Sequence, residues 1–223
     1  MRRFLRNNGL SLVVVGTFLA IWLIGQTWAG MRTYNEQRRE DGDSAVAFAQ
    51  YLTTAHFGEA TFENWESEFL QMAMYVILTV KLRQRGSAES KPIDDAAPQD
   101  EDPKLHRHDP DAPWPVRHGG AWLALYKYSL SLALIALFVL SFALHSLTGS
   151  RVFNSERASS GLTDHVTAWS YMLRSQFWFE SLQNWQSEFL AVAAIVIFTI
   201  FLRQHGSPES KPVHAPTAAT GTG

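Results

Sequence analysis

Two long runs without Asp, Glu, Lys or Arg limit what this sequence can fold into. The first covers residues 7–31 and the second covers residues 128–150. An α-helix needs about 20 apolar residues to cross roughly 30 Å of hydrocarbon. Both runs are long enough, so each predicts a membrane-spanning helix.

Two shorter uncharged runs, 69–80 and 189–202, are ambiguous by length alone. Tryptophans precede them and basic residues follow them, which is the pattern of interfacial anchors around a spanning helix. We therefore expect four transmembrane helices rather than two spans and a soluble core. The predicted anchors are Trp65, Trp185, Arg83 and Arg203.

The N-terminus also has the form of a signal peptide, because a basic MRRFLR precedes an apolar run and small residues near Ala29. The second long run resembles a copy of the first, however, and a mid-chain copy cannot be a cleaved signal. The first run is therefore expected to stay as an anchor.

Basic residues define the expected orientation. They precede the first span, follow the second, flank the third and follow the fourth: Arg2, Arg3, Arg6, Lys81, Arg83, Arg85, Arg117, Lys127, Arg203 and Lys211. Cytoplasmic loops carry the excess of Lys and Arg. Both termini and the central segment are therefore predicted to be cytoplasmic in a multi-pass protein.

The chain contains an internal duplication. Residues 64–92 and 184–212 are identical at 19 of 29 positions, and residues 30–35 align more weakly with residues 149–154. Each copy holds an even number of spans, so the copies share one orientation and form a parallel repeat. The expected fold is all-α, with two tandem helical hairpins at residues 1–92 and 119–212.

The segments outside the spans differ in character. Apolar residues at helical spacing predict short amphipathic outer helices over residues 44–55, with Ser44 as N-cap, and over residues 163–173. Residues 86–118 hold six of the nine prolines, eight acidic and four basic residues. We expect a disordered cytoplasmic linker at 93–118 and a flexible tail at 213–223.

Composition and motifs exclude several function classes. The chain has no cysteine and a net charge of −2, which argues against thiolate chemistry and against nucleic acid as a partner. Recognisable nucleotide-binding, hydrolase and metalloprotease motifs are absent from the sequence. The His106–Asp111 cluster has suitable metal ligands, but a proline-rich linker does not fix their geometry. We expect no enzyme activity, catalytic residue, cofactor or metal.

The repeated block NW[EQ]SEFL is the strongest functional signal. On a helix, Asn64 and Glu68 share one face, and Asn184 and Glu188 share the matching face of the second copy. Glu68 precedes Arg83 by 15 residues, roughly 22 Å of helix. If the arginine marks the inner boundary, the carboxylate lies inside the outer boundary of the hydrocarbon. An ionised group there must be neutralised, paired or hydrated.

Two functions remain open for this polar site. The leading hypothesis is an integral plasma-membrane protein that transports or senses a small solute or ion near its outer face. The alternative is a structural or partner-binding membrane protein, in which each Glu stabilises the first turns of its helix. Expected partners are the lipid bilayer and either another copy of the chain or a second membrane protein.

The combination of RRFLRxNGLS, NW[EQ]SEFLQ and LRQ[RH]GS[AP]ESKP resembles a family of uncharacterised bacterial integral membrane proteins. The resemblance covers both repeats and leaves out the linker and tail. It implies a bacterial origin and a plasma (inner) membrane location, and it implies no chemistry.

Overall fold

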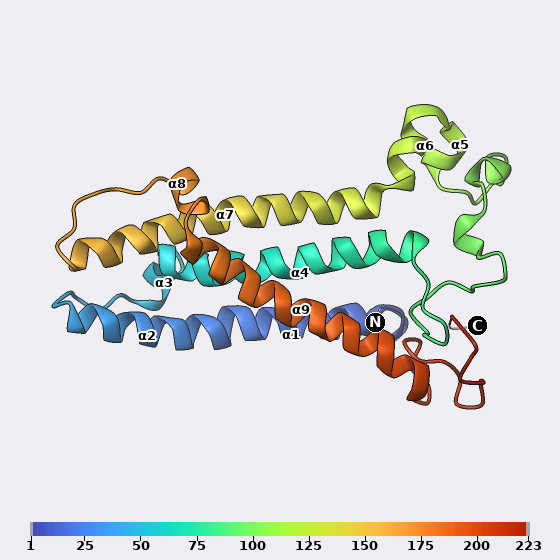
Figure 1. Ribbon diagram of the computed structural model, residues 1–223, viewed down its shortest axis with the longest axis horizontal. Helices are drawn as coiled ribbons and strands as arrows, with labels where there is room; N and C mark the ends of the chain where they lie inside the picture. Colours follow the sequence, from blue (N-terminus) through green and yellow to red (C-terminus); the bar gives the residue numbers. More distant parts are fainter. Residues whose placement is uncertain (1, 222–223) are drawn as a thin grey trace. The chain divides into compact units, whose positions relative to one another are not determined.

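A computed structural model of the chain describes residues 2–221, and the regular elements of this part are helices. Three helical elements follow one another without a break at the N-terminus (Figure 1): α1 (Arg2–Leu19), the π-helix η1 (Ala20–Gln26) and α2 (Thr27–Glu40). The other long helices are α4 (Ala55–Lys81), α7 (Ser129–Ser159) and α9 (Ser175–Phe201).

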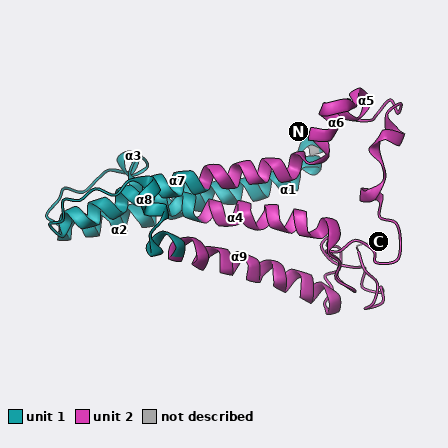
Figure 2. Ribbon diagram, turned by 45° about the horizontal axis from the view of Figure 1, so that its top comes forward, with its two compact units in different colours: residues 1–63, 142–178 teal, residues 64–141, 179–223 magenta. Residues whose placement is uncertain are grey.

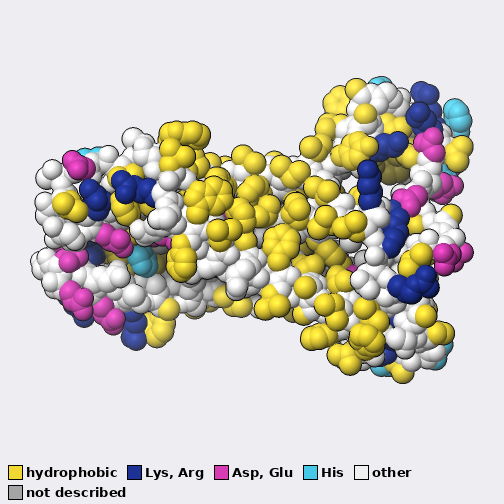
Figure 3. Space-filling view, viewed as in Figure 1, with side chains coloured by type: hydrophobic (Ala, Val, Ile, Leu, Met, Phe, Trp, Pro, Cys, Tyr) yellow, Lys and Arg dark blue, Asp and Glu magenta, His cyan; other side chains and the backbone are white. Residues whose placement is uncertain are grey.

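Three segments are long and apolar enough to cross a membrane: Arg3–Glu40, Ser129–Ser159 and Ser175–Phe201. In their most apolar 18-residue windows, 0%, 17% and 6% of the residues are buried. Apolar surface on this scale needs a lipid or protein environment, which is compatible with a membrane protein. In Figure 3, hydrophobic side chains cover most of the surface along the long helices, and charged side chains gather near helix ends. The short helix α6 (Gly120–Lys127) precedes α7.

Helix α4 does not meet the same criterion, although it has the 27-residue length of α9. Its first half carries four glutamates, Glu59, Glu63, Glu66 and Glu68, and these lower its hydropathy. The structure thus supports three of the four expected spans by length and composition, and the fourth stays a prediction.

The outer segments are shorter helices than the sequence indicated. Helix α3 covers Phe48–Tyr51 and α8 covers Ala168–Met172. Ser44 as N-cap is wrong, because α3 begins four residues later with Ala47 as its N-cap. In α8, the Thr167 hydroxyl accepts from the Ser170 N–H and performs the capping function.

The chain divides into two compact units (Figure 2). Unit 1 comprises residues 1–63 and 142–178, and unit 2 comprises residues 64–141 and 179–223. The buried core of unit 1 includes Val166, Tyr171 and Phe177, against which Phe142 and Phe153 pack. These five residues all come from the 142–178 part of unit 1.

Equivalent positions of the two repeats make equivalent contacts in unit 1. The Asn35 side chain accepts from Val46 N–H at 2.7 Å and donates to Val46 C=O at 3.0 Å. Asn154 makes the same pair of bonds to Val166, at 2.9 and 2.8 Å. Each asparagine side chain thus satisfies the backbone N–H and C=O of one valine in the extended segment before the short helix. These bonds hold that segment against the preceding long helix.

A buried tyrosine follows each of these segments. Tyr51 is 1% exposed, and its hydroxyl lies 2.9 Å from His56 Nδ1. Tyr171, its counterpart, is 0% exposed and packs edge-on against Phe177, as Tyr51 packs against Phe57. Both tyrosines are therefore core residues of unit 1.

Burial, followed by the charge of Tyr34, raises the pKa of Tyr51 to about 12 from its usual 10.0. The unfolded chain therefore ionises this tyrosine first, and folding loses free energy as pH rises through the window from 10 to 12. We expect the free energy of unfolding to fall by about 1.4 kcal/mol per pH unit in this window. Denaturant titrations of Tyr51→Phe should lack this component, and equal slopes in both proteins would contradict the assignment.

In unit 2, the two copies of the LRQ[RH]GS[AP]ESKP block form the same turn after α4 and after α9. Ser90 Oγ accepts from Gln84 N–H at 3.0 Å, and Ser210 Oγ accepts from Gln204 N–H at 2.9 Å. In the first copy, Gly86 has φ +83°, a left-handed conformation that favours glycine. The repeated sequence thus encodes a helix-terminating turn.

Short helices occupy the segment between the repeats: η2 (Pro98–Asp100), η3 (Pro103–His106) and α5 (Trp114–His118), followed by α6. The segment after α9 contacts the turn that follows α4, where Gly221 N–H donates to Ser87 C=O at 2.9 Å. Disorder of 93–118 and flexibility of 213–223 in solution stay predictions.

Candidate functional site

The four predicted polar residues lie in unit 2, on α4 and α9. Asn64 and Glu68 are exposed, and Asn184 and Glu188 are partly buried. The Asn64 carbonyl accepts from Ser67 Oγ at 2.7 Å, and the Asn184 carbonyl accepts from Ser187 Oγ at 2.8 Å. The two copies of the block are therefore alike in local structure but differ in exposure.

Glu68 on α4 and Glu188 on α9 occupy the same position in the two copies of the block. The α4, α7 and α9 segments of unit 2 contain no Lys, Arg or His between residues 64–80, 129–141 and 179–202. These helical segments therefore supply carboxylates without supplying a cation to balance them. A protonated carboxyl or a bound cation relieves repulsion between two such groups.

A third carboxylate, Glu66, was missed by the sequence analysis. It is 0% exposed, and its Oε1 accepts from Trp185 Nε1 at 3.3 Å. The Trp185 ring in turn lies 6.2 Å from the Phe138 ring, so residues of α4, α7 and α9 meet around this indole. The second repeat has Gln186 at the Glu66 position, and this difference hid the role of Glu66.

Trp185 is thus more than the interfacial anchor that the sequence predicted, because its N–H is used by a buried carboxylate. Trp65, its counterpart, is partly buried on α4. Sequence alone could have identified Glu66 only through the pairing of α4 with α9, which the local pattern does not contain.

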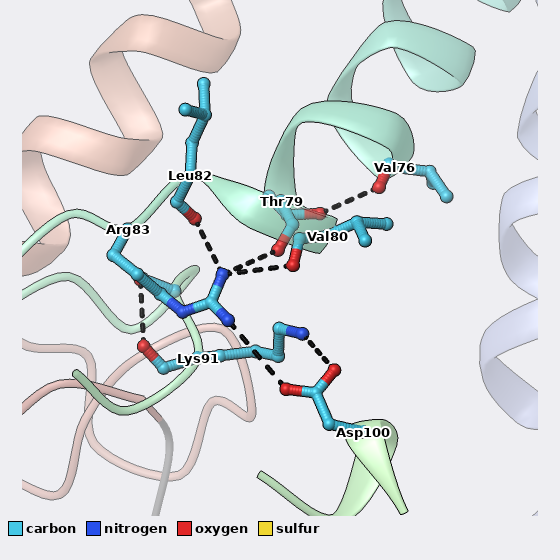
Figure 4. Close-up of polar contacts among 8 residues, drawn as sticks. Val76, Thr79, Val80, Leu82, Arg83, Lys91 and Asp100 are labelled. Carbon is cyan, nitrogen blue, oxygen red and sulfur yellow. Dashed lines mark hydrogen bonds and ion pairs between the residues drawn. The ribbon is translucent and has the colours of Figure 1, made fainter. Parts of the chain in front are cut away.

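Arg83 and Arg203, the other two predicted anchors, terminate their helices (Figure 4 shows Arg83). Arg83 Nη1 donates to the carbonyls of Val80 and Leu82, both at 3.1 Å. Arg203 Nη1 donates to Ile200 C=O at 3.2 Å and Leu202 C=O at 2.8 Å. Each guanidinium satisfies carbonyls left over at a helix C-terminus, where cations are favoured.

Near the turn that follows α4, the Asp100 carboxylate contacts two cationic side chains (Figure 4). Asp100 pairs with Lys91 and lies 3.8 Å from Arg83 Nη2. Tyr75 Oη donates to Glu89 Oε2 at 2.5 Å, connecting α4 to the same turn. This end of unit 2 is therefore an ordered polar network.

The turn after α4 also contacts α9 within unit 2. Ser87 Oγ lies 3.0 Å from Thr199 Oγ1, and Ala88 N–H donates to that hydroxyl at 3.3 Å. Thr199 therefore joins α9 to the turn after α4.

The His106–Asp111 cluster, considered above for its metal-ligand types, forms an exposed group of ion pairs. His106 Nδ1 lies 2.7 Å from Asp109 Oδ2, and Nε2 lies 3.2 Å from Glu101 Oε1. These hydrogen bonds and charges raise the pKa of His106 above its usual 6.5. Within residues 2–221, no three His, Cys, Asp or Glu side chains are placed to hold a metal ion.

Comparison with protein families gives one match. A family model described as a domain of unknown function, DUF6766, matches residues 1–222. No curated protein and no solved structure matches the chain.

Proposed function

Given that the chain belongs to the DUF6766 family, whose description assigns no activity, we propose that it is an integral membrane protein that transports or senses a proton or small cation. The site consists of Asn64, Glu68, Asn184 and Glu188, with Glu66 behind them. The observation that carries this proposal is the placement of an Asn and a Glu at matching positions of α4 and α9, on helical segments of unit 2 that have no basic residue.

A membrane location makes this arrangement functional rather than incidental. Acidic residues within spanning helices are costly and mark ion paths or proton relays. Glu68 is exposed and Glu188 is partly buried, so a hydrated cation can reach the pair from the solvent side. The amide groups of Asn64 and Asn184 add neutral oxygen ligands of the kind that hard cations use.

The proposed fold has four spans in two parallel repeats, with both termini cytoplasmic, in a bacterial plasma membrane. The 19 of 29 identical positions and the matched Asn35 and Asn154 contacts support the repeat. Three candidate spans support the membrane location. The basic residues after α4 and α9 support the orientation.

Topology has a direct test. Reporter fusions after Gly86 and after Lys211 should both report the cytoplasm, because basic residues flank each position. Fusions at Asp41 and Ser159 should report the outer compartment. An outer location for Gly86 would remove α4 as a span and contradict the parallel repeat.

The site is tested by Glu68→Gln/Glu188→Gln, which removes both charges and keeps size and hydrogen-bonding groups. In proteoliposomes with an entrapped pH dye, proton flux driven by a pH or cation gradient should fall by tenfold or more, about 1.4 kcal/mol or more in transition-state terms. The melting temperature at neutral pH should be unchanged or higher, because like-charge repulsion is removed.

Glu36→Gln/Glu40→Gln is the matched control, since it removes two exposed carboxylates from the end of α2. It should keep the parental flux. The proposal is contradicted if neither the melting temperature nor the proton flux of the parental protein depends on pH or on cation concentration.

A structural or partner-binding role is the second candidate. The Trp185–Glu66 and Ser87–Thr199 hydrogen bonds favour it, because the first joins α4 to α9 and the second joins the turn after α4 to α9 within unit 2. In that case Glu66→Gln, which copies Gln186 of the second repeat, should lower the melting temperature more than the Glu68→Gln/Glu188→Gln variant does.

A further inference from the structure

Unit 2 contains a cavity of about 1270 Å³ beside the end of α4. Its walls come from α4, the turn after it, the segment 98–104, and the α6–α7 junction. The volume exceeds the usual 300–1,000 Å³ range of sites for drug-sized ligands. The cavity therefore has room for a ligand as large as a lipid.

The acidic side chains that line this cavity already have partners. Asp100 pairs with Lys91, and Glu89 accepts from the Tyr75 hydroxyl. Glu101 pairs with His106, and Asp102 Oδ1 accepts from the Lys104 backbone N–H at 3.1 Å. Each of these carboxylates is therefore already engaged by a cation or by a hydrogen-bond donor.

Two lysines that line the same cavity, unlike its carboxylates, have side chains without such partners in the described part of the chain. Lys104 in η3 and Lys127 in the last turn of α6 are both exposed and both line it. Across residues 2–221, neither ammonium group has a hydrogen-bond or ion-pair partner. The cavity therefore presents two uncommitted positive charges, which fit an anionic group.

Part of the cavity lining is apolar. Val76 and Val80 of α4, Leu130 of α7 and Leu123 of α6 line it. Val80 is 54% exposed and Leu130 is 61% exposed, and Leu130 lies in a candidate span. An amphiphile can place hydrocarbon against this wall while its polar end meets the lysines.

We propose that this cavity binds one anionic glycerophospholipid, with the phosphate between Lys104 and Lys127 and the acyl chains along Val76, Val80 and Leu130. Basic pockets at the cytoplasmic ends of spanning helices are suited to such headgroups. The site depends on the membrane location proposed above and is independent of Glu68 and Glu188.

The test is native mass spectrometry of the detergent-purified full chain titrated with phosphatidylglycerol. One bound lipid should dominate, and Lys104→Gln/Lys127→Gln should weaken its binding roughly thirtyfold, from the contribution of each lysine near an anionic surface. The control Lys81→Gln/Arg85→Gln removes two exposed charges outside the cavity and should bind as the parent does.

Three comparisons decide the chemistry. Phosphatidylcholine and diacylglycerol should bind much more weakly than phosphatidylglycerol, and excess inorganic phosphate should not displace the lipid. Equal weakening in the control variant would show general surface charge and overturn the proposal. Full displacement by inorganic phosphate would show a simple anion site and overturn it as well. Circular dichroism and melting temperature verify that the surface variants are folded, and Lys104→Glu/Lys127→Glu should abolish binding.

Discussion

Replacing Lys211 with methionine is expected to release residues 212–221 from the turn that follows α4. Lys211 is 1% exposed, and its ammonium donates to the carbonyls of Gly86, Thr217 and Ala219. Methionine preserves the volume but leaves three carbonyls without this donor. Hydrogen bonds to a charged group contribute about 1.5–3 kcal/mol each, so the local loss should be about 3 kcal/mol.

The loss is smaller than the sum of three bonds because the buried charge has its own cost. Burial, and then the charge of Arg203, lowers the pKa of Lys211 below its usual 10.5. Removing the ammonium recovers part of this desolvation free energy. The helices should remain intact, since the affected contacts involve turns and the chain after α9.

Hydrogen exchange is the measurement. The amides of Gly86 and Gly221, which donate to Thr220 Oγ1 and Ser87 C=O, should exchange on the order of 100-fold faster in Lys211→Met. Lys91→Met is the matched control, because the equivalent lysine of the first repeat pairs with Asp100 instead. It should leave these two amides protected. Unchanged exchange in Lys211→Met would show that the tail is held by other contacts.

Gly30→Ala should destabilise the protein by about 1–3 kcal/mol through overpacking. A Cβ at Gly30 would lie 2.2 Å from the Tyr51 hydroxyl and 3.1 Å from Cζ. Tyr51 is buried against Tyr34 and Phe57, so its ring has little room to move. In a Tyr51→Phe background the hydroxyl is gone and the shortest remaining distance is 3.1 Å to Cζ, so the same substitution should cost clearly less than in the parent. The helix propensity gain of Ala over Gly, up to about 1 kcal/mol, offsets part of the remaining cost.

The second repeat supplies the control. A Cβ at Gly149 would lie 2.7 Å from Tyr171 Cε1, a ring carbon rather than the hydroxyl. Gly149→Ala should therefore be destabilising to the same extent in the parent and in Tyr171→Phe. Urea or thermal unfolding in detergent of the two double-mutant cycles measures both couplings. A Gly30→Ala cost that is equally large with Tyr51→Phe would contradict the close approach.

The sequence determined those features that depend on local pattern and on length. Uncharged runs of about 20 residues predict long helices, because backbone groups in hydrocarbon must be satisfied within the segment. The continuous helical elements over 2–40 and the helix over 129–159 confirm this expectation. The repeated block also predicted equivalent local structure, and the matched turns at Ser90 and Ser210 have it.

Tertiary structure alone decided which polar side chains are buried. Helical periodicity placed Glu68 on the important face, but the meeting of Trp185 with α4 buries Glu66 instead. Lys91 and Lys211 occupy the same position of the repeated block, yet one pairs with a carboxylate and the other donates to three carbonyls. Periodicity gives the angle of a side chain around its own helix. The contacts of Glu66 with Trp185 and of Lys211 with Gly86 instead join residues 119 and 125 positions apart in the chain, so only the folded chain determines them.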